Sequence, residues 1–293
     1  MSSVISGVGS YLPTLRITNQ DFIAHRFFKD IDQPFDESNE VIIQKFQEIT
    51  GIQERRYAQK EQTNSDLGIL AAQKALAAAQ IDPEQLDYII FAHNFGDVRF
   101  ASNHLDMLPA LAARVKHALG IANPNCVAYD MLFGCPGWIE ALIQAHLFIK
   151  AGAAKHCLVI GSETLSRVVD PHDRDSMIFA DGAGACVLSE DSNAESGILA
   201  HATQTFTKDE AYFLNNGPSL NSKHHIHEKY IKMQGRKIYE FALTKVPQAM
   251  KAALDKSGVS ISDVKKVFIH QANEKMDEAI IDRFYRLYKA ERP

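Results

Sequence analysis

Helical and strand-like hydrophobic patterns alternate along this chain. Apolar positions three and four residues apart predict helices over 66–80, 105–119 and 136–150. Short continuous apolar runs predict buried strands at the N-terminus and over 88–92, 127–131 and 156–161. A further bent or paired strand is expected over 178–188, broken at Asp181-Gly-Ala-Gly184. Because strands alternate with helices, the pattern predicts an α/β protein whose helices cover sheets.

A longer pattern suggests that the chain is duplicated. The end of a helix, a polar turn and an apolar strand begin at Leu76 and again at Leu254, 178 residues later. We therefore predict two similar halves, 1–190 and 191–293, that meet in a polar stretch near residue 190. After its strand the first copy continues for about 100 residues, and the second for about two dozen. The second half is thus expected to be incomplete at its C-terminus.

Composition and charge exclude several classes of protein. A hydrophobic share of 46% and a charged share of 23% exclude a disordered chain and a fibrous repeat. The net charge of -5 offers no global attraction for nucleic acid or an anionic membrane. No apolar stretch approaches the roughly 20 residues of a membrane span, and the N-terminus does not resemble a secretion signal, so cytoplasm is expected. The four scattered cysteines contain no CxxC pair, which argues against a disulfide framework or a zinc site.

Cys135 is the first candidate for chemistry. It follows the predicted strand 127–131 and precedes Pro136, a residue favoured at the first helical position. At a helix N-terminus, the dipole and the free N–H groups favour a thiolate and could hold an oxyanion. Gly134 and Gly137 permit a tight backbone there. The local sequence also allows a cysteine that merely fills the core.

His270 is the second candidate. It opens the motif His270-Gln-Ala-Asn273, directly after the predicted apolar strand 267–269. Open α/β sheets place ligands at the carboxyl ends of their strands. A histidine there could polarise a carbonyl or take a proton near neutral pH, although a structural histidine remains the alternative.

Five segments of the chain occur in an order typical of one family. They are Thr50–Arg56, Asp130–Trp138 around Cys135, Gly161–Arg167 with Asp170–Arg174, Phe179–Ala185, and His270–Asn273. The sequence resembles the β-ketoacyl-acyl-carrier-protein synthase III family of the thiolase superfamily over essentially its whole length from Gly7. Five motifs in order are far more specific than either catalytic fragment alone.

The resemblance implies a fold and a reaction. The fold would be the thiolase-like five-layer αβαβα arrangement of two duplicated halves, the second truncated here. Cys135 would accept an acyl group from a thioester, and the enolate left by decarboxylation of a malonyl thioester on acyl carrier protein would attack it. His270 would hydrogen-bond the malonyl thioester carbonyl, and the Cys135 N–H would contribute to an oxyanion hole.

The same resemblance implies partners and a pathway. The enzyme would be a homodimer without a cofactor, using acyl-CoA or acyl carrier protein thioesters and malonyl-acyl carrier protein as substrates. Its place would be fatty acid or related secondary metabolite biosynthesis.

One family feature has no counterpart in this sequence. Relatives carry a third catalytic residue, an asparagine in a Gly-Asn motif, and a glycine-rich terminal loop, and residues 274–293 match neither. Asn273 belongs to the histidine motif and does not replace that asparagine. Two alternatives therefore stay open: a Cys135-dependent acyltransferase that does not condense, and a non-catalytic partner subunit of a heterodimeric synthase.

Other departures concern substrate binding. Trp138 stands where relatives more often have phenylalanine, and Phe100 aligns with a residue that crosses the dimer interface, so the resemblance assigns both to the acyl pocket. Lys45 and Ile49 replace a tryptophan and an arginine that grip the coenzyme A nucleotide in many relatives. Adenine stacking is therefore lost, and coenzyme A is not the expected preferred carrier of the primer.

The resemblance also suggests a docking surface for an acidic carrier protein. Its candidate residues are Arg236, Lys237, Gln271, Ala272, Asn273 and Lys275. Glu240 stands where a family lysine is expected. An ordinary solvated surface is the alternative for the three cations.

Two further segments have residue patterns that are typical of functional sites. Residues 223–228 contain three histidines but are loop-like and have no partner cluster, so no metal is expected. The acidic segment 170–175 matches a family motif that implies a structural turn.

Overall fold

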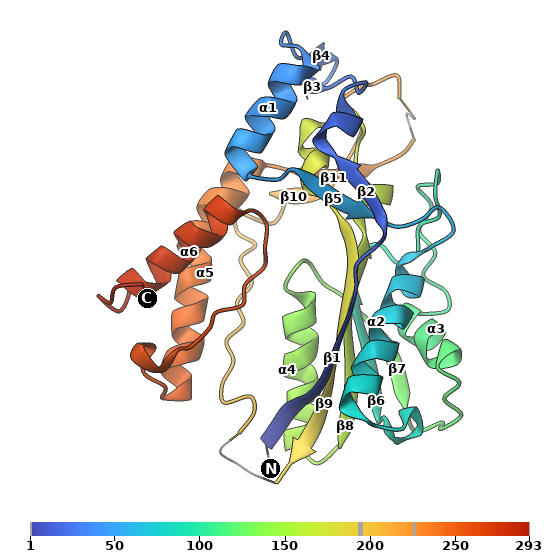
Figure 1. Cartoon of the computed structure of the whole chain (residues 1–293), viewed down its shortest axis with the longest axis vertical. Helices are drawn as coiled ribbons and strands as arrows, with labels where there is room; N and C mark the ends of the chain where they lie inside the picture. Colours follow the sequence, from blue (N-terminus) through green and yellow to red (C-terminus); the bar gives the residue numbers. More distant parts are fainter. Residues whose placement is uncertain (1, 193–195, 225–226, 293) are drawn as a thin grey trace. The chain divides into compact units, whose positions relative to one another are not determined.

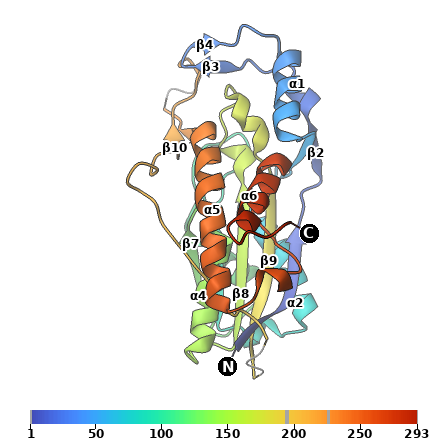
Figure 2. The same ribbon diagram turned by 90° about the vertical axis from the view of Figure 1, so that its left-hand side faces the viewer.

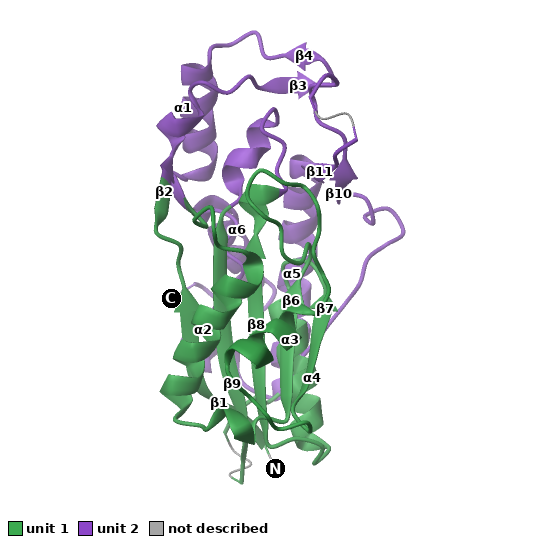
Figure 3. Cartoon of the chain, turned by 90° about the vertical axis from the view of Figure 1, so that its right-hand side faces the viewer, with its two compact units in different colours: residues 1–16, 56–167, 180–199 green, residues 17–55, 168–179, 200–293 purple. Residues whose placement is uncertain are grey.

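The computed structural model describes residues 2–192, 196–224 and 227–292 of the 293-residue chain. The chain forms two compact units (Figure 3). Unit 1 comprises Met1–Arg16, Arg56–Arg167 and Ala180–Leu199, and unit 2 comprises Ile17–Arg55, Val168–Phe179 and Ala200–Pro293. These units interleave along the sequence. The predicted duplication into halves 1–190 and 191–293 stays a prediction.

Unit 1 is built on a five-stranded sheet with the order β1-β9-β8-β6-β7. Its strands are β1 (Ser2–Tyr11), β6 (Tyr88–His93), β7 (Val127–Leu132), β8 (His156–Thr164) and β9 (Asp181–Asp191). Strands β8, β6 and β7 run parallel, whereas β9 is antiparallel to both β8 and β1. Ala92 of β6 lies opposite Gly161 on one side and Met131 on the other. The carboxyl ends of the three parallel strands therefore meet at one edge of the sheet.

Helices cover both faces of this sheet (Figure 1). They are α2 (Asn64–Ala79) and α3 (Leu111–Ala118) on one face, and α4 (Gly137–Lys150) on the other. Because successive strand residues point to opposite faces, Phe91 joins the core beneath α2 while Ile90 joins the core beneath α4. The alanine-rich α2 lies so close to β1 that a Cβ on Gly9 would stand 2.2 Å from the Ala71 carbonyl oxygen.

Most predicted elements of unit 1 are confirmed, but three boundaries were wrong. Strand β8 ends at Thr164 instead of 161, because β9 pairs with it as far as Thr164. Helix α3 begins at Leu111 instead of 105, because Pro109 disfavours a helical residue before it and Asp130 accepts the Leu111 and Ala112 N–H groups, each at 2.8 Å. Strand β9 begins at Asp181 instead of 178. The segment Asp181–Gly184 is part of this strand, because β8 pairs with all four of its residues and β1 pairs with Ala183 and Gly184.

Unit 2 has a helical core. Helices α5 (Gly235–Ser257) and α6 (Glu274–Arg286) lie side by side (Figure 2) and bury Leu243, Met276 and Ile280 between them. Helix α1 (Asn39–Thr50) contacts α6. No helix in the described ranges is both long and apolar enough to cross a bilayer.

Three two-stranded sheets complete the described structure. They pair β10 (Leu214–Gly217) with β11 (Tyr230–Met233), β3 (Phe28–Asp30) with β4 (Gln33–Pro34), and β2 (Leu15–Thr18) with β5 (Glu54–Tyr57).

The predicted strand 267–269 does not form in this structure. Residues 264–273 are all described and have no regular secondary structure. A strand exists only when its backbone pairs with another, and no described strand pairs with this segment. Phe268 is accordingly 86% exposed, although its neighbours in the sequence are apolar and have the pattern of a strand.

Candidate active site

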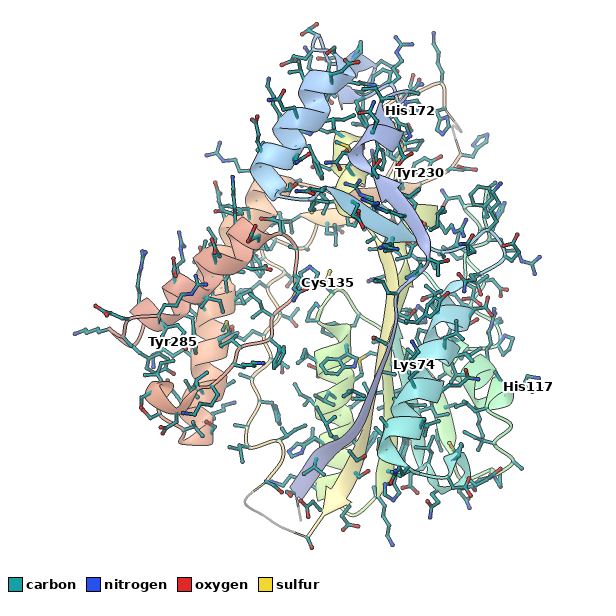
Figure 4. The ribbon with its side chains drawn as sticks, in the orientation of Figure 1. Lys74, His117, Cys135, His172, Tyr230 and Tyr285 are labelled. Carbon is teal, nitrogen blue, oxygen red and sulfur yellow. The ribbon has the colours of Figure 1, made fainter. Side chains whose placement is uncertain are left out.

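Cys135 lies in the loop between β7 and α4, one residue before Pro136, the N-cap of α4 (Figure 4). The loop turns tightly there, since the Gly137 N–H donates to the Gly134 carbonyl at 2.7 Å. The thiol is free and exposed, whereas the other three cysteines are buried. The structure thus places Cys135 at a helix N-terminus, and its exposure argues against a core-filling role.

The environment of Cys135 favours the protonated thiol. Desolvation by the surrounding atoms raises the pKa of Cys135, although part of its surface stays exposed. Its own backbone N–H lowers this pKa, and the nearby carboxylate of Glu163 raises it. The net direction is opposite to the one expected from the helix N-terminus alone. Cys135 therefore holds its proton at rest and must release it when it attacks an electrophile.

Glu163 was missed by the sequence analysis as a residue with chemistry. It lies at the carboxyl end of β8, where its Oε1 accepts hydrogen bonds from the Asn94 N–H and from Asn94 Nδ2, the latter at 3.0 Å. Its Oε2 is buried and has no hydrogen-bond partner in the described ranges. Burial raises the pKa of Glu163 to about 7. A signal was present, because Glu163 follows a predicted strand as Cys135 does.

His93 of β6 and Asp130 of β7 also lie next to each other near this edge of the sheet. His93 Nδ1 accepts the Gly96 N–H at 3.0 Å, which leaves the proton on Nε2. That atom is 3.1 Å from Asp130 Oδ2, although it is not aligned for a good hydrogen bond. Burial raises the pKa of Asp130, but its contacts with His93 and with two α3 N–H groups outweigh this and lower it. Asp130 therefore connects β7 to both β6 and the start of α3.

Trp138 and Phe100 flank this region within unit 1. Trp138 is the second residue of α4 and packs onto β8, where a Cβ on Gly161 would lie 2.9 Å from the Trp138 Cβ. Phe100 is 52% exposed and lies 4.9 Å from the Arg167 guanidinium and 5.2 Å from Lys60 Nζ, as measured to its ring centre. Their role as acyl-pocket residues stays a prediction.

His270 lies in unit 2, in the irregular segment before α6. Desolvation lowers the pKa of His270, and the carboxylate of Asp277 on α6 raises it in part. The imidazole is therefore mainly neutral at pH 7, with one ring nitrogen that can donate a hydrogen bond. Asp277 was not predicted as a neighbour of His270.

The other residues of the histidine motif differ in what they contact. Asn273 is the N-cap of α6, and its Oδ1 accepts the Met276 N–H at 3.0 Å. Gln271 is exposed and Ala272 is half-buried. Asn273 thus has a structural use besides its predicted docking role.

The three predicted docking cations have different surroundings. Arg236 on α5 is 92% exposed and pairs with Glu240 at 2.9 Å. Lys237 Nζ lies 5.2 Å from the centre of the Phe213 ring. Lys275 on α6 donates to the Glu48 carbonyl at 2.5 Å. Glu240 thus offsets the charge of Arg236.

The two positions that the family resemblance assigns to nucleotide binding, Lys45 and Ile49, carry no aromatic ring. Lys45 pairs with Glu37 at 3.2 Å, and Ile49 is exposed on α1. The loss of adenine stacking stays a prediction.

The structure describes the acidic segment 170–175 completely and the histidine-rich segment 223–228 only in part. Residues 225–226 of the histidine-rich segment lie outside the described residues, and the rest of the described chain contains no group of three potential metal ligands. Asp170 is buried and accepts hydrogen bonds from Lys232 Nζ at 2.5 Å, the Leu220 N–H at 2.7 Å and Ser219 Oγ at 2.9 Å. Asp170 is therefore the centre of a structural turn, as expected.

The fold and the site define a class. An exposed cysteine at a helix N-terminus, at the carboxyl edge of a helix-covered sheet, is the nucleophile setting of a thiolase-like condensing enzyme. Unit 2 by itself carries His270, whose pKa is lowered by desolvation. A sequence profile described as 3-Oxoacyl-[acyl-carrier-protein (ACP)] synthase III matches residues 129–206. The β-ketoacyl-[acyl-carrier-protein] synthase III of Sphingopyxis alaskensis is 34% identical over 282 residues, which cover 94% of this chain and 79% of the relative. The chain therefore belongs to the β-ketoacyl-acyl-carrier-protein synthase III family, whose members are acyltransferases that form carbon–carbon bonds.

Solved structures support the same assignment. The 3-oxoacyl-[acyl-carrier-protein] synthase III from Aquifex aeolicus VF5 superimposes with a TM-score of 0.75 at 32% identity, covering 99% of this chain and 82% of that chain. The priming β-ketosynthase from the R1128 polyketide biosynthetic pathway gives a TM-score of 0.79 at 25% identity, covering 97% and 78%. The predicted thiolase-like fold class is confirmed.

Proposed function

We propose that this chain catalyses a priming condensation between an acyl thioester and a malonyl thioester carried by acyl carrier protein. The observation that carries the proposal is the exposed, free thiol of Cys135 at the N-terminus of α4. The relatives named above are synthases of this type, and one is a priming enzyme of polyketide biosynthesis. Fatty acid or related secondary metabolite biosynthesis is the proposed pathway.

In the first half-reaction Cys135 is the nucleophile. Its Sγ attacks the thioester carbonyl carbon, and the bond to the leaving thiol breaks. The leaving sulfur takes up the proton that Cys135 loses, so protons balance. The Cys135 N–H and the free N–H groups at the start of α4 are the donors for the transient oxyanion.

In the second half-reaction His270 is the donor. The malonyl carboxylate leaves as carbon dioxide, and the electron pair of the broken bond forms an enolate on the thioester. Neutral His270 donates a hydrogen bond to that oxygen. The enolate carbon then bonds to the acyl carbon, and Cys135 leaves as a thiolate that regains a proton. These steps need no resident cofactor, and we propose none.

Intact-mass analysis tests the first half-reaction. After incubation with acyl-CoA or acyl carrier protein thioesters, the wild type should gain the mass of one acyl group, and Cys135→Ala should gain none. Cys126→Ala is the matched control, because Cys126 is a buried cysteine of the same unit and should leave acylation intact. No mass gain, or equal gain in Cys135→Ala, would defeat both enzyme interpretations and favour the non-catalytic subunit. Comparing the two primer types also identifies the preferred carrier.

Carbon dioxide release tests the second half-reaction. The acylated wild type should release carbon dioxide from malonyl-acyl carrier protein, and His270→Ala should retain acylation but lose this release. Acylation without any release in the wild type would support the simple acyltransferase instead.

We further propose a homodimer formed through β7. This strand is the outermost of the five-stranded sheet next to β6, so one of its backbone edges has no strand partner among the described residues. Apolar side chains on and near it are exposed: Leu132 is 62% exposed, and Val127, Phe133 and Leu108 are exposed as well. Such an edge favours pairing with another chain. Sedimentation analysis should show a dimer that Leu132→Lys weakens, whereas Val8→Lys, on the opposite edge strand β1, leaves it unchanged. Equal behaviour of both variants would contradict this interface.

We propose that Arg236 and Lys275 help to dock the acidic carrier protein. Reversing both charges to glutamate should raise KM for malonyl-acyl carrier protein several-fold and leave acylation by acyl-CoA unchanged. Unchanged carrier-protein kinetics would remove this proposal. The proposed location is the cytoplasm, where a reducing environment keeps an exposed thiol such as Cys135 free.

A further inference from the structure

Glu163 is a half-buried acid at the same sheet edge as the nucleophile. Strands β8, β6 and β7 are parallel and in register, so residues that follow their carboxyl ends gather together. Glu163 is the penultimate residue of β8, Asn94 directly follows β6, and Cys135 comes three residues after the end of β7. All three belong to unit 1.

Only one oxygen of the Glu163 carboxyl group accepts hydrogen bonds in the described ranges. Both hydrogen bonds that it accepts come from Asn94 and reach Oε1, while Oε2 is buried without a partner in the described ranges. An unpartnered buried carboxylate oxygen is costly when charged and much less so when protonated. Burial accordingly raises the pKa of Glu163 to about 7, so the group changes charge near neutral pH.

The charge on Glu163 acts electrostatically on the Cys135 thiol. A negative Glu163 raises the pKa of the Cys135 thiol. Two other ionisable groups face Glu163 from the neighbouring strands: His93 from β6 lowers the pKa of Glu163, and Asp181 from β9 raises it. Asp181 is held by Ser166 Oγ at 2.6 Å and by the Ala58 N–H at 2.7 Å.

We propose that Glu163 is a positioning residue that sets the reactivity of Cys135 through its own protonation. With a neutral Glu163 carboxyl, Cys135 forms the thiolate more readily; with an ionised Glu163, the neighbouring charge holds the proton on the thiol. Glu163 acts through Cys135 and does not itself bond to the acyl group. This inference rests on the proposed function only in taking Cys135 as the nucleophile.

Alkylation of Cys135 by iodoacetamide, followed by intact mass from pH 5.5 to 9.5, tests the proposal. Glu163→Gln keeps an oxygen for the Asn94 donors and removes the charge. The ratio of its alkylation rate to that of the wild type should be near one at pH 6 and rise through about pH 7. Above pH 8 it should level off at roughly three- to tenfold. Glu190→Gln is the matched control, because Glu190 lies on β9 beside the opposite end of β8 and should give a ratio of one throughout.

A ratio that is independent of pH would overturn the proposal, because a purely structural effect of the substitution has no reason to change near neutral pH. The wild type provides a second reading that does not depend on how the variant folds. Its alkylation rate should rise with pH in two steps separated by a shallower region near pH 7, whereas a single titration step contradicts the proposal. Alkylation uses no substrate, so the absence of an acyl adduct would refute the proposed function alone. Acyl adducts combined with a pH-independent ratio would refute the role of Glu163 alone.

Discussion

Gly161 is the position where a single methyl group should disturb the nucleophile loop. In Gly161→Ala the new Cβ would lie 2.9 Å from Trp138 Cβ, 3.2 Å from Cδ1 and 3.4 Å from Cγ. Carbon atoms normally approach to about 3.5–4.0 Å, so the closest pair overlaps by roughly 0.6 Å or more. Because β8 is paired on both sides and α4 is packed on the sheet, neither backbone can retreat without cost. Overpacking of this kind destabilises a protein by about 1–3 kcal/mol.

Variants of Trp138 separate the clash from other effects. Trp138→Ala removes the two ring atoms but keeps the Cβ, so the cost of Gly161→Ala should fall only partly in that background. Trp138→Gly removes all three atoms, and the cost should nearly vanish. Gly184→Ala is the matched control, since Gly184 pairs with Gly161 across the β8–β9 ladder and has open space around its missing Cβ. It should change the free energy of unfolding by less than about 0.5 kcal/mol.

Urea unfolding of each single and double variant at pH 7 measures these free energies. Acylation of Cys135 should slow in Gly161→Ala, because displacement of Trp138 moves the first turn of α4 that follows the cysteine. If Gly161→Ala has the same cost with Trp, Ala and Gly at position 138, the steric explanation is refuted.

Two further predictions follow from the ionisable groups. Lys232→Met leaves Asp170 buried with three backbone and hydroxyl donors but no cation, so urea unfolding should show a loss of about 2–4 kcal/mol at pH 7. Asp170 is desolvated, yet its hydrogen bond with Lys232 and those from backbone N–H groups lower its pKa below the unfolded value; the stabilisation is therefore complete above about pH 4 and is lost as pH falls through the folded pKa. An equal penalty at pH 3 and pH 7 would contradict this. Asp277→Asn removes the carboxylate that raises the pKa of His270, so an NMR titration should place that pKa lower than in the wild type. An unchanged or higher value would show that Asp277 does not act on His270.

Elements set by local pattern were predictable from the sequence. Helix α2 and strand β6 match their predicted bounds to within two residues. Helix α2 buries one face and β6 is buried along almost its whole length, and both patterns can be recognised from neighbouring residues alone. Cys135 was identified for the same reason, since a strand, a tight glycine turn and a proline suffice to predict a helix N-terminus.

Features that depend on a distant partner were decided by the tertiary structure. The start of α3 depends on Asp130, which lies 19 residues beyond Leu111 and accepts its N–H. The segment 267–269 has the pattern of a strand, but pairing requires a neighbour that no local pattern supplies. The ionisation of Glu163 depends on burial beside His93 and Asn94 at the end of β6 and beside Asp181 at the start of β9, two other segments of the chain. The sequence by itself identified Cys135 and His270 as candidates. Only the fold decided that the charges of Glu163 and Asp277 act on them, because desolvation and distance exist only in the packed chain.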